Sequence, residues 1–119
     1  MTNKELLELH RGINQCGNLT GIEFSYAIAK NAKKIQSEVE TIDSEIKKIQ
    51  LENCKKDKKG EPIIENDKYV MKDMGKFDKE YKKLLDIEIN IEIHKIKKEM
   101  LPQNISAIQM SGILSLIEE

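Results

Sequence analysis

A long run of residues with alternating four-and-three hydrophobic spacing constrains this chain more than any other feature. The run lies between Thr20 and Lys55, and no proline interrupts it before Pro62. That period keeps one apolar stripe on one side of an α-helix for about three heptads. The chain must therefore bury one side of a long amphipathic helix. The stripe consists of Ile28, Ala32, Ile35, Val39, Ile42, Ile46 and Ile49.

Two interpretations of this stripe stay open. In the first it is an intramolecular core, covered by Phe77, Tyr81 and Leu84 of a second helix and by the isoleucines of residues 87–93. In the second it is partly a protein interface, because a helix of about 30 residues spans about 45 Å and a partner helix of about ten residues cannot cover it. Self-association or docking onto another protein then follows. The candidate interface residues are Ile28, Ile35, Val39, Ile42, Ile46 and Ile49.

Three capping-box patterns predict where helices begin. In each, a Thr or Ser and a Glu or Gln three residues later satisfy each other's unpaired backbone N–H groups. The first predicts a helix over residues 3–14, the second begins the long helix, and the third begins a final helix. Gly112 weakens that final helix by roughly 1 kcal/mol relative to alanine. The pairs are Thr2 with Glu5, Thr20 with Glu23, and Ser106 with Gln109, and the final helix directs Met110, Ile113, Leu114 and Ile117 inward.

The sequence becomes β-prone after the long helix. Lys55–Pro62, with the sequence KKDKKGEP, ends the helix through charge repulsion, a glycine and a proline without an amide hydrogen. Pro62–Ile64 and Tyr69–Met71 are two short β-prone runs, separated by residues 65–68. They predict a hairpin with a turn of about four residues.

Two further elements complete the expected fold. Lys76–Leu85 fits a second, shorter helix, and the isoleucines of residues 87–93 alternate with polar residues as in a half-buried strand. We therefore expect an α+β fold in which the long amphipathic helix packs on the shorter helix. A small antiparallel β-sheet, made of the hairpin and one strand, and short terminal helices accompany them. The length of 119 residues is that of one domain, so a single domain over residues 1–119 is expected.

Charge and targeting signals limit the environment and the partners. Charged residues make up 34% of the chain, but the net charge is only −1, so no long-range field attracts a polyanion. Arg11 is the only arginine, which leaves almost no bidentate donor for phosphate or carboxylate. The N-terminal sequence MTNKELLELH lacks the apolar core of a signal peptide, and no stretch approaches the roughly 20 apolar residues of a membrane span. A cytoplasmic location without membrane contact is expected.

No constellation of residues predicts an active site. Cys16 and Cys54 are far apart, have no C-x-x-C spacing, and are expected to be isolated reduced thiols, Cys16 as a small buried residue. His94 shares a strand face with Glu92 and is expected to pair with it at the surface, while His10 is expected to be exposed. The common nucleotide-binding, hydrolase and zinc-protease motifs are missing from the sequence. The sequence predicts no enzyme, no cofactor, no metal and no small-molecule substrate.

The lysine clusters support an alternative function. Nucleic-acid phosphates are one ligand that such lysines bind, and the chain would then be a nucleic-acid-associated accessory protein. Acidic residues interrupt the clusters, no aromatic residue accompanies them to stack on a base, and the pI is about 6.2. Nucleic-acid binding is therefore the second choice. The candidate phosphate contacts are Lys55, Lys56, Lys58 and Lys59, and a second cluster covers residues 95–98.

Three segments carry a resemblance to known proteins. They are NLTGIEFSYAIAKNAKKI, the K-x-G-x-P-I-I pattern before the hairpin, and the final LPQNISAIQMSGILSLIEE. Together they resemble small uncharacterised proteins encoded by phages and prophages of Gram-positive bacteria. The resemblance implies a phage context and no site residues. With the apolar stripe, it leads us to expect a non-enzymatic protein-interaction or structural role, in a process such as phage assembly or host takeover.

Overall fold

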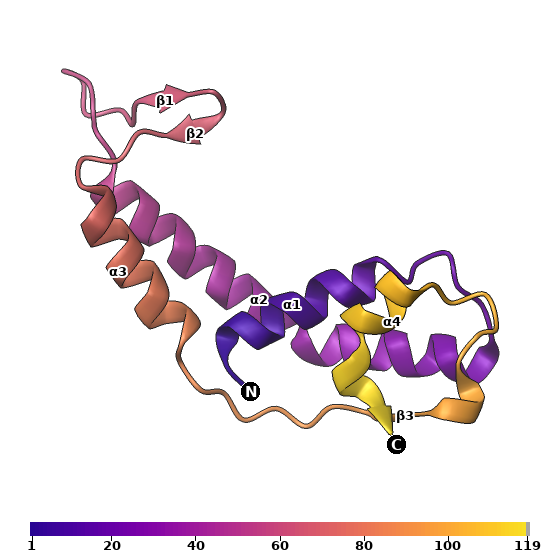
Figure 1. Cartoon of the computed structure of the whole chain (residues 1–119). Coiled ribbons are helices and arrows are strands. Elements are labelled where there is room, and N and C mark those ends of the chain that lie inside the picture. The colour runs from indigo at the N-terminus through magenta and orange to yellow at the C-terminus, as the bar shows by residue number, and fades with distance from the viewer. Residues whose placement is uncertain (119) are drawn as a thin grey trace. The chain divides into compact units, whose positions relative to one another are not determined.

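The computed structural model describes residues 1–118 and is mainly helical (Figure 1). By its contacts the chain divides into two compact units. Unit 1 combines Met1–Val39 with the chain from Glu88 onward, and unit 2 is Glu40–Ile87. The boundary falls inside the long helix α2, Ile22–Asn53. The single domain expected over residues 1–119 stays a prediction.

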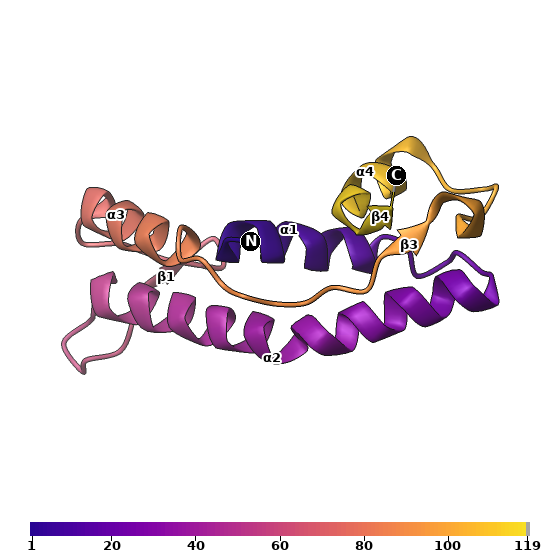
Figure 2. The ribbon, with the colours of Figure 1, turned by 90° about the horizontal axis from the view of Figure 1, so that it is seen from below.

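Unit 1 is made of helices and one very small sheet. Besides the first part of α2 it contains α1 (Asn3–Asn14), α4 (Ala107–Gly112) and two 3-10 turns, Lys98–Met100 and Leu114–Leu116. Strands β3 (Ile96–Lys97) and β4 (Ile117–Glu118) pair in parallel, with Ile96 opposite Ile117. Residues 88–95, which we call the extended segment, connect unit 2 to β3 and run along the first part of α2 without regular secondary structure (Figure 2).

Two of the three predicted capping boxes are confirmed. The Thr2 side chain accepts a hydrogen bond from the Glu5 amide at the start of α1, and Ser106 does the same with Gln109 at the start of α4. The box at Thr20 is wrong. The carbonyl of Gly21 accepts the first helical hydrogen bond of α2, from the Ser25 amide at 2.8 Å, which makes Gly21 the N-cap. Gly21 has φ +117°, a conformation that glycine adopts without a Cβ clash.

The core of unit 1 forms where α2 packs on α1. On α2 the buried face begins at Phe24 and continues through Ala27, Asn31 and Ile35. The predicted stripe began instead at Ile28, which is only half-buried. The helical period was correct, but the first turns of α2 are rotated relative to the prediction, with a buried aromatic and a buried amide on the inner face. The other buried apolar residues of this unit are Leu6, Leu9, Ile13, Cys16, Leu19, Val39, Ile96, Ile113 and Leu116.

The strand predicted over Ile87–Ile93 is wrong. This segment is extended, but only Glu88 forms a bridge, to Thr2, and the regular strand β3 begins later, at Ile96. The alternation is nevertheless retained, because residues 89, 91 and 93 are half-buried and residues 88, 90 and 92 are exposed. In this extended conformation the β-branched side chains lie on the half-buried side and the polar side chains face solvent, without a second strand at the segment's edge.

A backbone crossing between α1 and α4 explains both of their glycines. A Cβ added to Gly112 would lie 2.8 Å from the Cα of Gly12, and one added to Gly12 would overlap the carbonyl group of Gly112. Gly112 therefore permits close packing while lowering the propensity of its short helix. The C-terminal prediction is partly wrong: Ile113 is buried, but α4 ends at Gly112, so Leu114 is exposed and Leu116 is buried instead.

Unit 2 begins with the second part of α2 and continues into a hairpin. Strands β1 (Ile64–Glu65) and β2 (Lys68–Tyr69) pair antiparallel around Asn66 and Asp67, whose φ angles are 52° and 63°. Two successive left-handed residues are typical of the type I′ turn. The hairpin is confirmed, with a turn of two residues rather than about four. Bridges from Cys54 to Met71 and from Lys56 to Pro62 attach it to the end of α2.

Helix α3 (Met74–Leu85) confirms the second predicted helix, two residues earlier than expected because Asp73 caps it. The rings of Phe77 and Tyr81 stack with centroids 5.7 Å apart, and α3 packs on α2. The two sheets each have two strands, β1 with β2 and β3 with β4. The expected single sheet of hairpin plus strand is therefore wrong. The fold is α+β in composition and predominantly α.

Candidate interaction surface

A buried amide attaches the extended segment to α2. The Asn31 side chain donates from Nδ2 to the His94 carbonyl at 2.8 Å and accepts from the His94 amide at Oδ1 at 2.7 Å. One side chain thus supplies both bonds that a neighbouring strand would give. Lys34 Nζ adds a bond to the Glu92 carbonyl at 3.1 Å. Asn31 is fully buried, and sequence reasoning missed it, although an asparagine between Ala27 and Ile35 on an apolar face is a signal for such a role.

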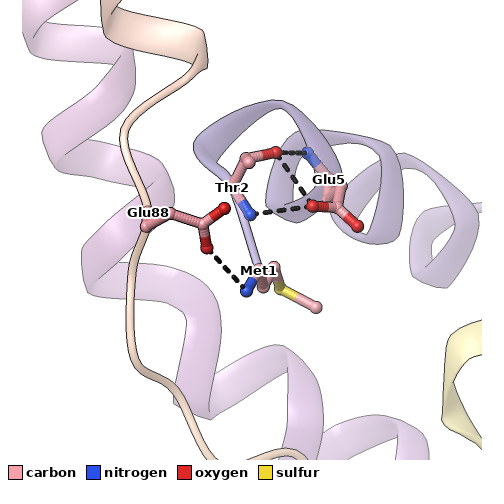
Figure 3. A network of polar contacts seen from close by, with 4 residues as sticks. All are labelled: Met1, Thr2, Glu5 and Glu88. Carbon is pink, nitrogen blue, oxygen red and sulfur yellow. Dashed lines mark hydrogen bonds and ion pairs between the residues drawn. The ribbon is translucent and has the colours of Figure 1, made fainter.

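The chain's N-terminus holds the other end of the same segment (Figure 3). The Met1 ammonium contacts Glu88 Oε2 at 3.2 Å, and the Ile89 amide donates to the Met1 carbonyl at 2.8 Å. Hydrogen bonds from the backbone and then the side chain of Thr2 lower the pKa of Glu5. The extended segment is therefore held near both of its ends, so its position on the neighbouring part of α2 is defined.

The ring of Tyr26 lies on the outer side of this arrangement. Its centroid is 6.1 Å from that of His94 in an edge-to-face contact, and Lys30 Nζ lies 5.7 Å from the Tyr26 centroid. Tyr26 remains 60% exposed. The predicted pair of His94 with Glu92 is wrong, since His94 contacts Tyr26 and forms no ion pair with Glu92 among residues 1–118.

Apolar side chains gather on the exposed side of the first turns of α2. Ile22 is 90% exposed, and Tyr26 follows it one helical turn later. Met100, 37% exposed, joins Ile22 in lining a groove of about 430 Å³, which Glu23 and Glu99 also line. We call Ile22, Tyr26 and Met100 the outer patch. The i, i+4 spacing of Ile22 and Tyr26 was visible in the sequence, but the longer stripe on the opposite side of the helix masked it.

The residues predicted as an interface lie on the inner side of α2. Ile35, Val39 and Ile42 are buried, whereas Ile28, Ile46 and Ile49 are half-buried. In the chain as it stands, the buried residues serve as core and are not accessible to a partner. An interface through this stripe stays a prediction that requires the chain to open.

The predicted phosphate-binding lysines surround a tight turn in unit 2. Lys55, Lys56, Lys58 and Lys59 are all exposed. Asp57 closes the turn, since its Oδ1 accepts from the Lys59 amide at 2.8 Å and from the Glu61 amide at 3.0 Å. A carboxylate thus lies at the centre of the cluster and opposes an approaching phosphate. In the second cluster, Lys95 Nζ is bound to the Ser115 carbonyl at 2.8 Å.

The thiols and histidines form no reactive group. Cys16 and Cys54 are both free, as predicted, and both are buried, which was predicted for Cys16 alone. Burial raises the pKa of the Cys16 thiol, which disfavours the nucleophilic thiolate. His10 is half-buried rather than exposed, with Nε2 3.4 Å from Asn14 Nδ2. Within the part of the chain that the structure describes, no three potential metal ligands come together.

Comparison of the chain with protein-family models, curated proteins and solved structures gave no match. No helix within residues 1–118 is both long and apolar enough to cross a membrane. Function must therefore be inferred from the chain's own surfaces.

Proposed function

We propose that this chain is a non-enzymatic protein-interaction protein that acts in a phage or prophage process such as assembly or host takeover, and that the outer patch is its binding surface. The observation that carries the proposal is the 90% exposure of Ile22 beside Tyr26 and Met100. Apolar side chains that cluster at a surface bind partners more often than isolated ones. Tyrosine is enriched among residues that dominate binding energy.

The surroundings of the patch suit this role. Asn31 and Lys34 hold the extended segment against α2, so the Tyr26 ring lies on a preorganised support. Preorganised side chains lose less conformational entropy on binding. The acidic residues Glu23 and Glu99 line the groove beside Ile22 and Met100 and would supply polar contacts next to the apolar ones, as in most interfaces.

The test is an affinity capture from the native host under prophage-inducing conditions, with nuclease treatment and a high-salt wash, read by mass spectrometry. The variant Ile22→Ser with Tyr26→Ser should lose a protein that the unmodified chain retains. The matched control is Ile64→Ser, because Ile64 is 59% exposed but belongs to the hairpin of unit 2. Equal retention by all three proteins would refute the outer patch as the binding surface.

The same experiment tests the alternative of nucleic-acid binding. Lysine–phosphate contacts weaken steeply with salt, whereas apolar burial does not. If the retained material is nucleic acid that nuclease or salt removes, a variant with Lys55, Lys56, Lys58 and Lys59 changed to glutamine should abolish its retention. That outcome would replace the proposed function.

A further inference from the structure

We infer that the outer patch binds a second copy of this chain, through antiparallel pairing of the first three turns of α2. The inference rests on the proposed function and names its partner. It follows from the exposed face of the helix, from the charges at the two ends of that face, and from how an antiparallel arrangement brings them together.

The exposed face is a narrow stripe opposite the core. With 3.6 residues per turn, Ile22, Tyr26, Ala29 and Lys33 lie on one side of α2, opposite Phe24, Asn31 and Ile35. All four are exposed. The centre of the stripe is apolar, and Ala29 is small enough to let another helix approach closely. Short residues at a crossing permit such close approach, as the two glycines of α1 and α4 do within unit 1.

Opposite charges lie at the two ends of this stripe. Glu23 and Glu99 are near Ile22 at its beginning, where they line the same groove, and Lys95 and Lys97 line a second pocket that Glu23 and Met100 share. Lys30 and Lys33 lie two to three turns further along α2. None of the carboxylates of Glu23 and Glu99 or the ammonium groups of Lys30 and Lys33 forms an ion pair within residues 1–118, and the Lys30 ammonium lies over the Tyr26 ring. These carboxylates and ammonium groups are therefore available to a partner.

An antiparallel second copy is complementary to this arrangement. A two-fold axis between Tyr26 and Ala29 places Tyr26 of one copy opposite Ala29 of the other and Ile22 opposite Lys33, whose aliphatic stem can cover it. This two-fold axis is perpendicular to the helix axes, so the same flank of both helices lies on the same side of the pair. Glu23 and Lys30 lie on one flank, and Glu23 of one copy therefore approaches Lys30 of the other. The carboxylates of one copy thus approach the lysines on α2 of the other, and a parallel arrangement would instead bring Glu23 near Glu23 and Lys30 near Lys30.

The expected dimer is weak. Three helical turns and the neighbouring Met100 form a contact at or below the lower end of the size range of specific interfaces. Dimerisation should therefore depend on protein concentration. It should also weaken as salt screens the exposed charge pairs.

The experiment is sedimentation of the full chain over a wide concentration range at low and high salt. Two charge reversals are compared: Lys30→Glu with Lys33→Glu, and Glu23→Lys with Glu99→Lys. Each should weaken dimerisation about tenfold or more, because each reversal turns attraction into repulsion and every charge pair occurs twice in the dimer. The four changes combined should restore the dimer. The matched control, Lys79→Glu with Lys82→Glu, changes the net charge equally on α3 and should have no effect.

Failure of the inference is distinguishable from failure of the proposed function. A chain that stays monomeric at every concentration, or a dimer indifferent to both reversals, overturns antiparallel pairing. If such a chain still captures a host or phage protein that Ile22→Ser with Tyr26→Ser releases, the proposed function stands and only its partner changes. Circular dichroism of each variant verifies that the helices remain folded, so that loss of the dimer reports on the interface.

Discussion

The two units of this chain contain very different amounts of buried apolar surface. All the buried apolar side chains within residues 1–118 lie in unit 1, except Ile42 and Cys54. Unit 2 instead has half-buried residues on α3 and exposed hairpin strands, with burial concentrated where the hairpin meets the end of α2. Both units share the same helix, so the difference does not come from α2 itself. It comes from what covers it.

The covering elements differ in how far apart they lie in the sequence. Unit 1 assembles α1, α2, the extended segment and α4 from the two ends of the chain. Unit 2 is one continuous stretch in which a hairpin and α3 follow directly after α2. Unit 1 therefore depends on long-range packing, and unit 2 depends more on caps and turn geometry. Four predictions test this difference.

The largest expected effect is loss of core packing in unit 1. Ile35→Ala removes a fully buried side chain and should cost about 4 kcal/mol in the free energy of unfolding, measured with urea. Ile49→Ala is the matched change on the part of α2 in unit 2. Since Ile49 is half-buried, about 1 kcal/mol is expected. Equal losses would contradict the proposed difference between the units.

The next effect concerns the crossing of α1 and α4. Gly12→Ala should cost about 3 kcal/mol, because the new methyl group meets the backbone of Gly112 and backbone atoms cannot move aside as a flexible side chain can. Gly17→Ala is the control, since its added Cβ would lie 3.7 Å from the nearest atom, the Asn14 carbonyl oxygen. Thermal unfolding of both variants measures the difference. A tolerated Gly12→Ala would show that the helices are not in close contact.

A smaller effect is expected for the buried asparagines of α2. Asn31→Ala leaves the amide and carbonyl of His94 without their partner and should cost about 2 kcal/mol. Asn53 bonds the Ile49 carbonyl of its own helix and the partly exposed Glu80 carboxylate. Asn53→Ala should therefore cost about 1 kcal/mol. Amide exchange should accelerate at His94 only in the first variant, and unchanged exchange there would exclude Asn31 as the residue that holds the segment.

The smallest effect is a gain in stability in unit 2. Asp67 has φ +63°, so Asp67→Gly should raise the free energy of unfolding by about 0.5 to 1 kcal/mol. The control makes the opposite change: Gly60 has φ +80°, so Gly60→Ala should lower the free energy of unfolding by about 1 kcal/mol. Chemical denaturation, followed by the NMR chemical shifts of the hairpin amides, measures the free energy of unfolding of both variants. Destabilisation by Asp67→Gly would show that the aspartate side chain, and not backbone conformation, stabilises the turn.

Local features of this fold were predictable from the sequence because their physical causes are local. The caps at Thr2 and Ser106, the helix over residues 3–14 and the hairpin depend on residues within about four positions of one another. The exposed lysines near Gly60 were equally evident. The outer patch was not identified, because a pair of exposed apolar residues has no periodic signal until the opposite face of the helix is known to be buried.

The sequence by itself determined the helical periods, the starts of α1 and α4, the hairpin and the absence of an obvious catalytic motif. Only the tertiary structure decided which face of α2 is buried at its beginning, that the backbone of Glu92 and His94 bonds to side chains of α2 rather than to a strand, and that Gly12 meets Gly112. Those outcomes depend on contacts between residues far apart in the chain. Periodicity specifies that a face must be covered, but which segment covers it depends on packing and hydrogen bonding across the whole fold.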